Sequence, residues 1–327
     1  MSPVRVAVDA MGGDRAPEEV VAGAVEAASD EVAPVLYGRR KRLEPLAAGL
    51  PIVHADEVVA MNEKPSDAVR EKRASSLFLA CRAVGEREAE AVVSAGNTGA
   101  ALAAGLVEIR RLPAVQRPAI AVPLPAVGGP SVLLDAGANA DARPEHLVQF
   151  AHMGAVFAEE ILGIREPEVA LLSIGEEAEK GNRLVREAHP ELEASGLRFV
   201  GNVEGRDLLA RAADVVVCDG FTGNMALKLL EGTIKTTLDT FRAEVTASLR
   251  GKLGGLLIRP AARALRERLD PETYGGAYLL GLRGLVVIAH GNSSRTAIAN
   301  AIRYAARGVR SGVVEHLGER VGAGRAG

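Results

Sequence analysis

Apolar and polar positions follow two alternating patterns through the first third of the chain. Short apolar runs predict buried strands, and longer segments with apolar residues at helical spacing predict helices. The expected strands are Val4–Ala10, Pro34–Tyr37, Pro51–His54 and Ala91–Ala95, and the expected helices are Pro17–Ser29, Ser66–Arg87 and Thr98–Arg111. This order predicts a doubly wound α/β fold, in which a mostly parallel sheet lies between two layers of helices.

The pattern changes in the middle of the chain. Ala119–Pro123 and Ser131–Asp135 are spaced like consecutive strands with no helix between them. We therefore predict that residues 112–140 form a small inserted lobe or a dimer arm. The alternation then resumes with strands at Val169–Ile174, Arg198–Val200, Asp214–Cys218 and Gly284–Ala289, and with helices at Pro144–Leu162, from Asn182, from Arg206 and at Ser293–Leu317. We expect residues 1–327 to form a single α/β domain around a central cleft, with fraying over 321–327.

A helical hairpin is predicted near the end of the chain, over residues 245–270. A long helical pattern from Gly223 to about Leu249 precedes a glycine-rich break at 251–258 and a basic helix at Pro260–Leu269. An apolar tip with basic flanks is typical of a protruding amphipathic segment that contacts an anionic membrane surface. Packing of the hairpin against a second subunit is the alternative. The residues expected at the membrane are Leu253, Leu256, Leu257, Ile258, Arg259 and Arg263.

Glycine-containing polar turns follow six of the apolar runs. Backbone N–H groups can point outward at such turns, and a following helix presents its positive end to an anion. Because the carboxyl ends of parallel strands line one edge of a sheet, we expect these turns to form one polar ligand site. The turns lie at residues 9–14, 94–99, 135–139, 173–176, 218–224 and 289–293.

Composition and charge restrict the class of protein. The chain has 327 residues, 48% of them hydrophobic, which is typical of a soluble globular protein with a large core. A net charge of -3 and an aromatic content of 3% argue against a nucleic-acid partner. Two cysteines, Cys81 and Cys218, form no disulfide framework or metal knuckle, and the start lacks a signal-peptide pattern. Because no apolar run approaches the roughly 20 residues that cross a bilayer, we expect a cytoplasmic protein.

The polar turns lack the motifs of several enzyme classes. The sequence contains no G-x-G-x-x-G at a strand–helix junction, no Walker motif, no nucleophile elbow and no H-E-x-x-H pair. The turns are instead rich in Gly, Asn, Thr and Asp. These groups suit transfer of an acyl group from a thioester to phosphate, because phosphate is already a nucleophile at neutral pH and a thiol of pKa about 8.5 leaves as thiolate. The protein then has to hold the anion and stabilise an oxyanion.

Four segments carry a resemblance to a known family. They read Asp-Ala-Met-Gly-Gly-Asp-x-Ala-Pro at 9–17, Ser-Ala-Gly-Asn-Thr-Gly-Ala at 94–100, Asp-Gly-Phe-Thr-Gly-Asn at 219–224 and Tyr-Gly-Gly-Ala at 274–277. Together they resemble the bacterial phosphate acyltransferase family called PlsX, in order and over nearly the whole chain. The resemblance implies that long-chain acyl-acyl carrier protein and phosphate give acyl phosphate and free carrier, the entry step to phosphatidic acid. It also implies a fold similar to that of isocitrate and isopropylmalate dehydrogenases and of phosphate acetyltransferase.

The expected partners also follow from this resemblance. They are the acyl carrier protein, inorganic phosphate, a second copy of the chain in a homodimer, an anionic membrane surface and the downstream glycerol-3-phosphate acyltransferase. No cofactor is expected. The protein is therefore predicted to be cytoplasmic and peripherally associated with the membrane.

Three residues are predicted to be catalytic. The resemblance places Lys180 at the cleft, where its ammonium would neutralise phosphate or the developing oxyanion. We predict that Asn224 contacts the oxyanion or phosphate, and that His290 hydrogen-bonds phosphate or passes a proton. The predicted substrate- and phosphate-binding residues are Asp9, Gly12, Gly13, Asp14, Asn97, Thr98, Gly99, Asn139, Gly223, Gly291, Asn292 and Ser293.

Structural roles stay open for several of these residues. Asn97 and Asn224 could instead cap helices, a role that asparagine often fills. Asp14 could cap the helix that follows it, and Asp9 could satisfy buried loop amides. Lys180 could be a solvated charge beside neighbouring glutamates, with little effect on stability.

No metal is predicted for the chain. Asp9, Asp135 and Asp219 end three strands and could in principle hold magnesium, but they form no tight ligand motif. Cys218 suggests a covalent acyl-thioester route at first sight. Its position at the end of an apolar run favours a small buried residue instead.

Three other functions remain as alternatives. One is a phosphate acetyltransferase that uses acetyl-coenzyme A. Another is an NAD-dependent dehydrogenase on the related fold, which would need an acidic pair for the adenosine ribose and a metal-binding aspartate cluster. A non-enzymatic membrane scaffold is the third, and the density of polar turns argues against it as the sole role.

Overall fold

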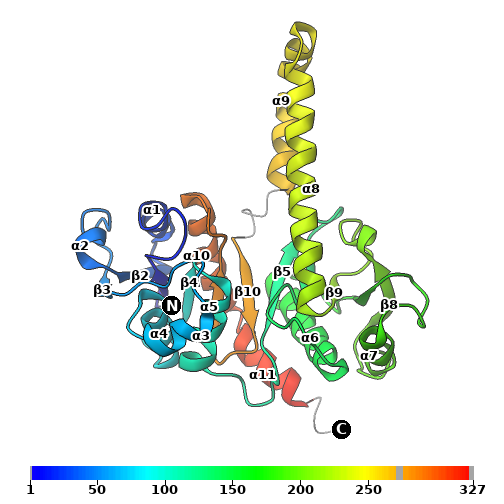
Figure 1. Cartoon of the computed structure of the whole chain (residues 1–327), viewed down its shortest axis with the longest axis horizontal. Helices are drawn as coiled ribbons and strands as arrows, with labels where there is room; N and C mark the ends of the chain where they lie inside the picture. The colour runs from blue at the N-terminus through cyan, green and yellow to red at the C-terminus, as the bar shows by residue number, and fades with distance from the viewer. Residues whose placement is uncertain (1, 270–274, 324–327) are drawn as a thin grey trace.

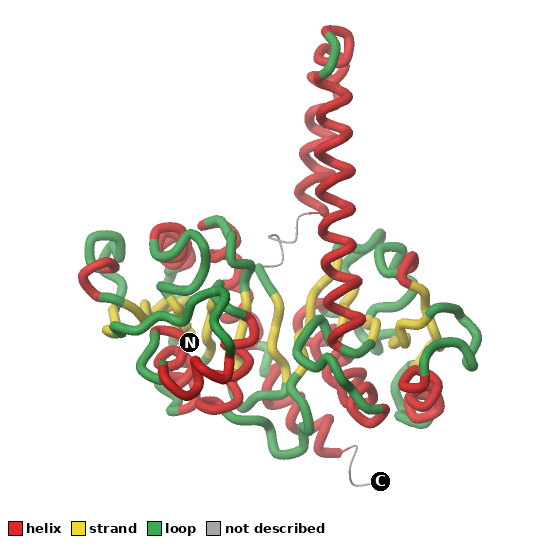
Figure 2. The backbone as a smooth tube through the Cα atoms, viewed as in Figure 1, coloured by secondary structure: helices red, strands yellow, loops and turns green. Residues whose placement is uncertain are grey.

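The computed structural model describes residues 2–269 and 275–323. Residue 270 of the predicted hairpin, Tyr274 of the fourth family motif and residues 324–327 of the predicted frayed end lie outside the described residues. The described chain forms one 11-stranded sheet with helices on both faces (Figure 1, Figure 2). This confirms the mostly parallel, three-layer α/β/α fold predicted from the sequence.

Five parallel strands make the first half of the sheet, in the order β3-β2-β1-β4-β11. They are β1 (Val4–Asp9), β2 (Val32–Gly38), β3 (Ile52–His54), β4 (Ala91–Ser94) and β11 (Leu285–Ile288). The helices of this half are α1 (Glu18–Ala27), α2 (Arg40–Leu43), α3 (Pro65–Glu71), α4 (Ser76–Gly85), α5 (Thr98–Ala104) and α10 (Arg295–Arg310). Because side chains alternate along a strand, Val6 and Val8 join the core beneath α1 and α10, while Ala7 joins the core beneath α4.

Four parallel strands make the second half, in the order β6-β9-β7-β8. They are β6 (Ser131–Leu134), β9 (Val215–Val217), β7 (Val169–Ser173) and β8 (Phe199–Glu204). The helices α6 (Pro144–Phe157), α7 (Arg183–Glu193) and α11 (Val313–Ala323) share the core of α1 and α10. The start of α8 (Gly220–Thr246) covers the opposite face.

Two strands between these halves reverse the strand direction. β10 (Ala277–Leu280) is antiparallel to both β11 and β5 (Ala119–Leu124), and β5 is antiparallel to β6. The two parallel halves therefore run in opposite directions and end at opposite edges of the sheet. The expectation that all six polar turns share one edge is wrong. The antiparallel strands separate the turns into two groups, and one of these strands, β10, was not predicted from the sequence.

The segment 112–140, predicted as a small lobe or dimer arm, contributes β5 and β6. Both strands lie inside the sheet, where β5 pairs with β10 and β6 pairs with β9. These residues thus continue the sheet from one half to the other. A role for them in a dimer stays a prediction.

The hydrophobic core is continuous on one face of the sheet and divided on the other. A single cluster runs under α1, α10, α6 and α7. On the opposite face, one cluster contains Ile120, another contains Leu124, and the partly buried Val122 packs against both. The division between the two cores therefore follows β5.

The prediction of a single helix at Ser66–Arg87 is wrong, because this segment forms two helices, α3 and α4. The backbone N–H of Ser76 donates to the carbonyl oxygen of Glu57 at 3.1 Å instead of continuing α3. The hydroxyl of Ser76 donates to Asp9 at 2.6 Å. The break thus serves to fix the start of α4 against β1.

Two more helix predictions are wrong. The segment from Arg206 forms one 3₁₀ turn, Gly205–Asp207, and then further turns, with Arg211 in the left-handed region at φ 58°. The terminal helix is divided into α10 and α11 at Gly312, whose φ is 70°. Left-handed backbone interrupts an α-helix in both places.

The hairpin formed by α8 and α9 (Leu249–Leu269) projects from the sheet (Figure 1, Figure 2). The residues predicted at the membrane all lie in α9, and their apolar members Leu253, Leu256, Leu257 and Ile258 are exposed in its first half. None of the helices in the described part of the chain is long and apolar enough to span a membrane.

The predicted glycine-rich break of the hairpin is wrong in position. The chain turns at Ala247 and Ser248, and residues 251–258 belong to α9. A Cβ atom on Gly251 would lie 2.4 Å from the carbonyl oxygen of Val245 at the end of α8. The glycine therefore serves the close approach of the two helices and does not form a loop.

Candidate active site

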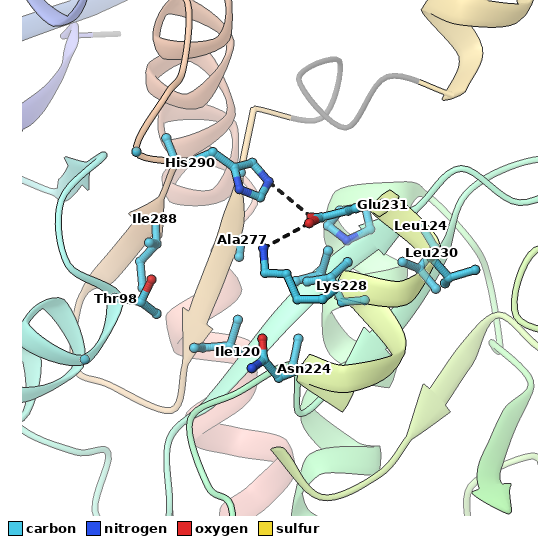
Figure 3. A pocket seen from close by; sticks show the side chains of 18 of the residues that line it. Thr98, Ile120, Leu124, Asn224, Lys228, Leu230, Glu231, Ala277, Ile288 and His290 are labelled. Atoms are coloured by element: carbon cyan, nitrogen blue, oxygen red, sulfur yellow. Dashed lines mark hydrogen bonds and ion pairs between the residues drawn. The ribbon is translucent and has the colours of Figure 1, made fainter. Parts of the chain in front are cut away.

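A cavity of about 410 Å³ lies between α8 and the loops of the first half of the sheet (Figure 3). Its volume falls within the range of about 300–1,000 Å³ that is usual for small-molecule sites. The cavity lies at the division between the two cores, because residues of β5 line it. Its apolar wall contains Ile120, Val122, Leu124, Leu227, Leu230 and Ile234.

One face of α8 brings three polar side chains to the cavity. Asn224, Lys228 and Glu231 are spaced four and three residues apart, so they lie on the same side of the helix. Lys228 Nζ donates to Glu231 Oε2 at 2.9 Å. No hydrogen bond of the Asn224 carboxamide occurs within the described residues, which leaves this amide available to a ligand.

His290 reaches the cavity from the opposite wall, in the loop after β11. Its Nε2 lies 3.5 Å from Glu231 Oε1, as the dashed line in Figure 3 marks. That oxygen is buried and accepts no hydrogen bond within the described residues. The carboxylate of Glu231 therefore lies between Lys228, from the same helix α8, and His290, from the loop after β11 in the other half of the molecule.

Asp9 lies below the turns and does not line the cavity. Its buried carboxylate accepts hydrogen bonds from the hydroxyls of Ser76 and Ser94, at 2.6 and 2.7 Å. Burial raises the pKa of Asp9, and the two hydroxyls oppose this shift. The residue thus joins the ends of β1 and β4 to the start of α4, a structural contact made through serine hydroxyls.

The turn after β4 contributes Asn97, Thr98 and Gly99 to the cavity lining. Asn97 Oδ1 caps α5 by accepting from the N–H of Ala100 at 3.0 Å. Its Nδ2 donates to two carbonyl oxygens of the 61–63 loop, at 2.8 and 2.9 Å. The carboxamide of Asn97 is therefore fully used by the protein. Thr98 is exposed, and its hydroxyl makes no hydrogen bond within the described residues.

The turns after β1 and β11 meet beside the cavity. The N–H of Asp14 donates to the carbonyl oxygen of Gly291 at 2.7 Å. Gly291 lines the cavity, whereas Asp14 is exposed outside the lining. The remaining predicted binding residues of these turns also lie outside the lining: Gly12, Gly13, Asn292 and Ser293.

The turn after β6 is held by the buried carboxylate of Asp135, which accepts five hydrogen bonds. The donors are the backbone N–H groups of Ile120, Gly137, Ala138 and Asn139 and the side chain of Asn139. Burial raises the pKa of Asp135, and the hydrogen bonds oppose this shift. Asn139 also donates to a backbone carbonyl and does not line the cavity, so its amide is occupied within the protein.

The turn after β9 starts α8. Asp219 caps the helix by accepting from the N–H and the hydroxyl of Thr222, at 2.9 and 2.7 Å. A Cβ on Gly223 would lie 2.0 Å from the carbonyl oxygen of Asp135, so only glycine lets α8 begin this close to β6. Cys218 is buried, and burial raises its thiol pKa, which keeps it protonated.

The three aspartates considered for magnesium do not fit a metal site. The carboxylates of Asp9, Asp135 and Asp219 each accept hydrogen bonds from protein donors. Over the described ranges 2–269 and 275–323, no group of three histidine, cysteine or acidic side chains is arranged to hold a metal ion.

Lys180 does not line the cavity. It lies in an exposed loop after β7, where its backbone N–H donates to the carbonyl oxygen of Glu177 at 3.0 Å. Within the described part of the chain its ammonium forms no ion pair. The structure thus brings Asn224 and His290 together at the cavity, and leaves Lys180 apart from them.

Lys228 and Glu231 line the cavity and were missed in the sequence. The signal was present, because both residues follow Asn224 at helical spacing in a helix that was already predicted. Their significance depends on the path of α8, which starts over the middle of the sheet (Figure 1) and turns these side chains to the cavity.

Comparisons with known proteins find relatives over nearly the whole chain. The family described as "Fatty acid synthesis protein" matches residues 4–316. The phosphate acyltransferase of Heliobacterium modesticaldum is 47% identical over 327 residues, which cover 97% of this chain and 98% of that protein. The phosphate acyltransferase of Thermobifida fusca is 51% identical over 311 residues, which cover 92% of this chain and 86% of that protein.

Solved structures share the fold at low sequence identity. The EutD phosphotransacetylase from Staphylococcus aureus aligns with a TM-score of 0.60 at 17% identity, over 94% of both chains. A phosphotransacetylase from Streptococcus pyogenes aligns with a TM-score of 0.63 at 17% identity, also over 94% of both chains. The family match and the full-length relatives together show that the chain belongs to the phosphate acyltransferase (PlsX) family of enzymes.

Proposed function

We propose that this phosphate acyltransferase moves a long-chain acyl group from acyl-acyl carrier protein to inorganic phosphate, giving acyl phosphate for phosphatidic acid synthesis. The observation that carries the proposal is the composition of the cavity. A cluster of polar and basic side chains borders an apolar wall within one cavity. Phosphate and an alkyl chain need these two environments side by side.

The polar part of the cavity suits phosphate. Lys228 supplies a positive charge, and Thr98 and His290 supply side chains that can hydrogen-bond an anion (Figure 3). Phosphate needs no strong base, because its dianion is already a nucleophile near neutral pH. Holding the anion in line with the thioester carbonyl is then the main task of these residues.

The apolar wall suits the acyl chain. Leu124 and Leu230 lie on the side of the cavity away from Thr98 (Figure 3). Each methylene group buried against such a wall contributes about 0.8 kcal/mol of binding free energy. This wall favours a long acyl donor over acetyl-coenzyme A, which has no chain to bury.

Asn224 lines the same cavity from the first turns of α8. Its unused carboxamide can donate to the thioester oxygen as that oxygen becomes an oxyanion. A donor placed in this way stabilises the transition state more than the ground state. Lys180, which the family resemblance places at the cleft, stays a proposed catalytic residue whose loop would have to approach the cavity.

Detection of acyl phosphate by mass spectrometry tests the proposal. Purified protein is mixed with palmitoyl-acyl carrier protein and inorganic phosphate, without nucleotide. Acyl phosphate that requires phosphate and appears with free carrier protein is the expected result. Acetyl phosphate from acetyl-coenzyme A, with none of the long-chain product, would instead identify a phosphate acetyltransferase. Turnover only with NAD and a hydroxy acid would identify a dehydrogenase.

We also propose that the protein is a cytoplasmic homodimer whose hairpin docks on an anionic membrane. The tip of the hairpin combines exposed leucines of α9 with arginines along the same helix. Those arginines would also attract the acidic acyl carrier protein and speed its encounter with the enzyme. Delivery of acyl phosphate to a membrane-bound glycerol-3-phosphate acyltransferase would follow from this location.

Flotation with phosphatidylglycerol-containing vesicles tests the membrane proposal. Arg263→Glu and Arg266→Glu combined with Leu257→Glu should release the protein from these vesicles, because each basic residue contributes about 1 kcal/mol near an anionic surface. Acyl transfer in solution should persist at saturating acyl carrier protein, with a slower encounter at low carrier concentration. Charge reversal at the exposed Arg70 and Arg117, away from the hairpin, is the matched control. Vesicle binding that survives the hairpin substitutions would favour packing of the hairpin on the second subunit.

A further inference from the structure

Glu231 contacts side chains from both walls of the cavity. Its Oε2 accepts from Lys228 Nζ at 2.9 Å, while its Oε1 lies 3.5 Å from His290 Nε2. A buried carboxylate oxygen without a donor costs free energy, and Oε1 accepts no hydrogen bond within the described residues. His290 Nε2 is the donor that a small movement would supply, and hydrogen bonds of active sites often shorten only when substrate binds.

This contact bears on which nitrogen of His290 carries the proton. A carboxylate is an acceptor, so it favours the tautomer with hydrogen on Nε2. Nδ1 then carries the lone pair. The His290 side chain is 43% exposed and lines the cavity. Within the described residues Nδ1 has no hydrogen bond, so it is available to accept a proton from a ligand.

The proposed reaction needs such a group to move one proton. A phosphate oxygen forms a bond to the thioester carbonyl carbon, and the C–S bond breaks with its electron pair leaving on sulfur. Hydrogen phosphate carries one proton, which becomes more acidic once the phosphate is acylated. The thiolate takes up a proton, because its thiol has a pKa of about 8.5. One proton must therefore pass from phosphate to sulfur, and the products are acyl phosphate dianion and free thiol.

We infer that Glu231 is a positioning residue for this transfer. It holds His290 with hydrogen on Nε2, so that Nδ1 accepts the phosphate proton and passes it to the leaving thiolate. The inference rests on the proposed function for its chemistry. The contact between Glu231 and His290 does not depend on the proposed function, and it can be measured without turnover.

Glu231→Gln is the variant that tests the inference. The glutamine oxygen has to face Lys228, because an ammonium can only donate. The glutamine NH2 group then faces His290 Nε2 and favours the tautomer with hydrogen on Nδ1. Glutamine is also a good helix former, so α8 is preserved. Glu244→Gln, on the same helix and outside the cavity lining, is the matched control.

Two measurements decide the outcome. Nitrogen NMR of labelled histidine near pH 8.5, where an ordinary imidazole is neutral, should show hydrogen on Nε2 of His290 in the wild type and on Nδ1 in Glu231→Gln. The kcat for acyl transfer should fall about 30-fold in Glu231→Gln, with the Kd for inorganic phosphate changed less than threefold. A His290→Gln variant identifies the resonance.

The contradicting results are distinct from failure of the proposed function. An unchanged tautomer in Glu231→Gln, or an unchanged kcat, would overturn the inference. Loss of phosphate binding with little change in kcat at saturating phosphate would also overturn it, because Glu231 would then act through Lys228 alone. Absence of any acyl phosphate from the wild type would refute the proposed function, while the NMR result would still decide the contact.

Discussion

The strand-end turns and the cavity-facing side of α8 are both rich in polar residues, yet they use them differently. In the turns, Asp9, Asn97 and Asp135 accept hydrogen bonds from neighbouring protein groups. On α8, Asn224 and Lys228 present amide and ammonium groups to the cavity. Side chains of similar chemistry therefore maintain the fold in the buried parts of the turns and remain available to a ligand on α8. Thr98 and His290 are turn residues that also line the cavity.

The difference follows from how each backbone is satisfied. A buried turn leaves N–H and carbonyl groups without regular partners, so nearby polar side chains must satisfy them. A helix interior satisfies its own backbone, so its polar side chains are not needed for that purpose. Polar residues in buried turns thus have a structural use before they have a chemical one.

The largest expected effect is loss of stability on substitution of a turn residue. Asp135→Ala removes the acceptor of five hydrogen bonds in a buried turn. We expect the free energy of unfolding to fall by at least about 3 kcal/mol, because unsatisfied buried donors cost about 1–3 kcal/mol each. Urea unfolding followed by circular dichroism measures this change. Asp141→Ala, at an exposed position, is the control, and a loss below 1 kcal/mol for Asp135→Ala would contradict the structural role.

Asn224→Ala should affect turnover and leave stability unchanged. Removal of a single oxyanion donor typically lowers kcat about 100-fold or more. We expect a decrease of about 100-fold in acyl phosphate formation, with the unfolding midpoint within error of the wild type. Thr233→Ala, on the same helix outside the cavity lining, controls for helix effects. Normal turnover would mean that the α8 face is not the reacting surface.

Two lysines distinguish the cavity from the loop after β7. Lys228→Met should raise the KM for phosphate about 30-fold, because it removes the ammonium that lines the cavity, a loss of about 2 kcal/mol. Lys180→Ala should lower turnover about 100-fold where its loop approaches the cavity as proposed, and only about threefold where Lys180 stays outside the lining. Steady-state kinetics with varied phosphate compares them. A larger effect of Lys180→Ala would show that its loop reaches the cavity in the reacting complex.

The smallest effect concerns pH and Asp9. Because burial raises the folded-state pKa of Asp9 above its ordinary value of 3.8, its contribution to stability is present below that value and is lost as pH rises through the folded-state pKa. The free energy of unfolding of Asp9→Asn relative to wild type should therefore increase with pH, by about 1.4 kcal/mol for each unit of pKa shift. Unfolding curves from pH 4 upward measure the difference. A constant difference would contradict the raised pKa.

Most strands could be predicted because each is a short apolar run that the sheet buries. The reversal of the sheet could not, since the four residues of β10 give no sign of direction. This strand forms a hairpin with β11, the next strand along the chain, and on its other side pairs with the distant β5. Asn224 and His290 were predicted for the site and do meet at the cavity. Lys228 and Glu231 were not, although both follow Asn224 at helical spacing, because nothing in the sequence around them shows that α8 starts over the middle of the sheet. Lys180 and the dimer remain predictions.

The length of α8 has a mechanical consequence. This single helix carries Asn224 near one end and Thr246 near the other, a separation of about 33 Å at about 1.5 Å per residue. That span slightly exceeds the hydrocarbon thickness of a bilayer, about 30 Å. A surface in contact with the hairpin tip would thus be kept at a fixed distance from the cavity, set by the length of α8. A product made in the cavity would have to move about the length of α8 before it reached lipid.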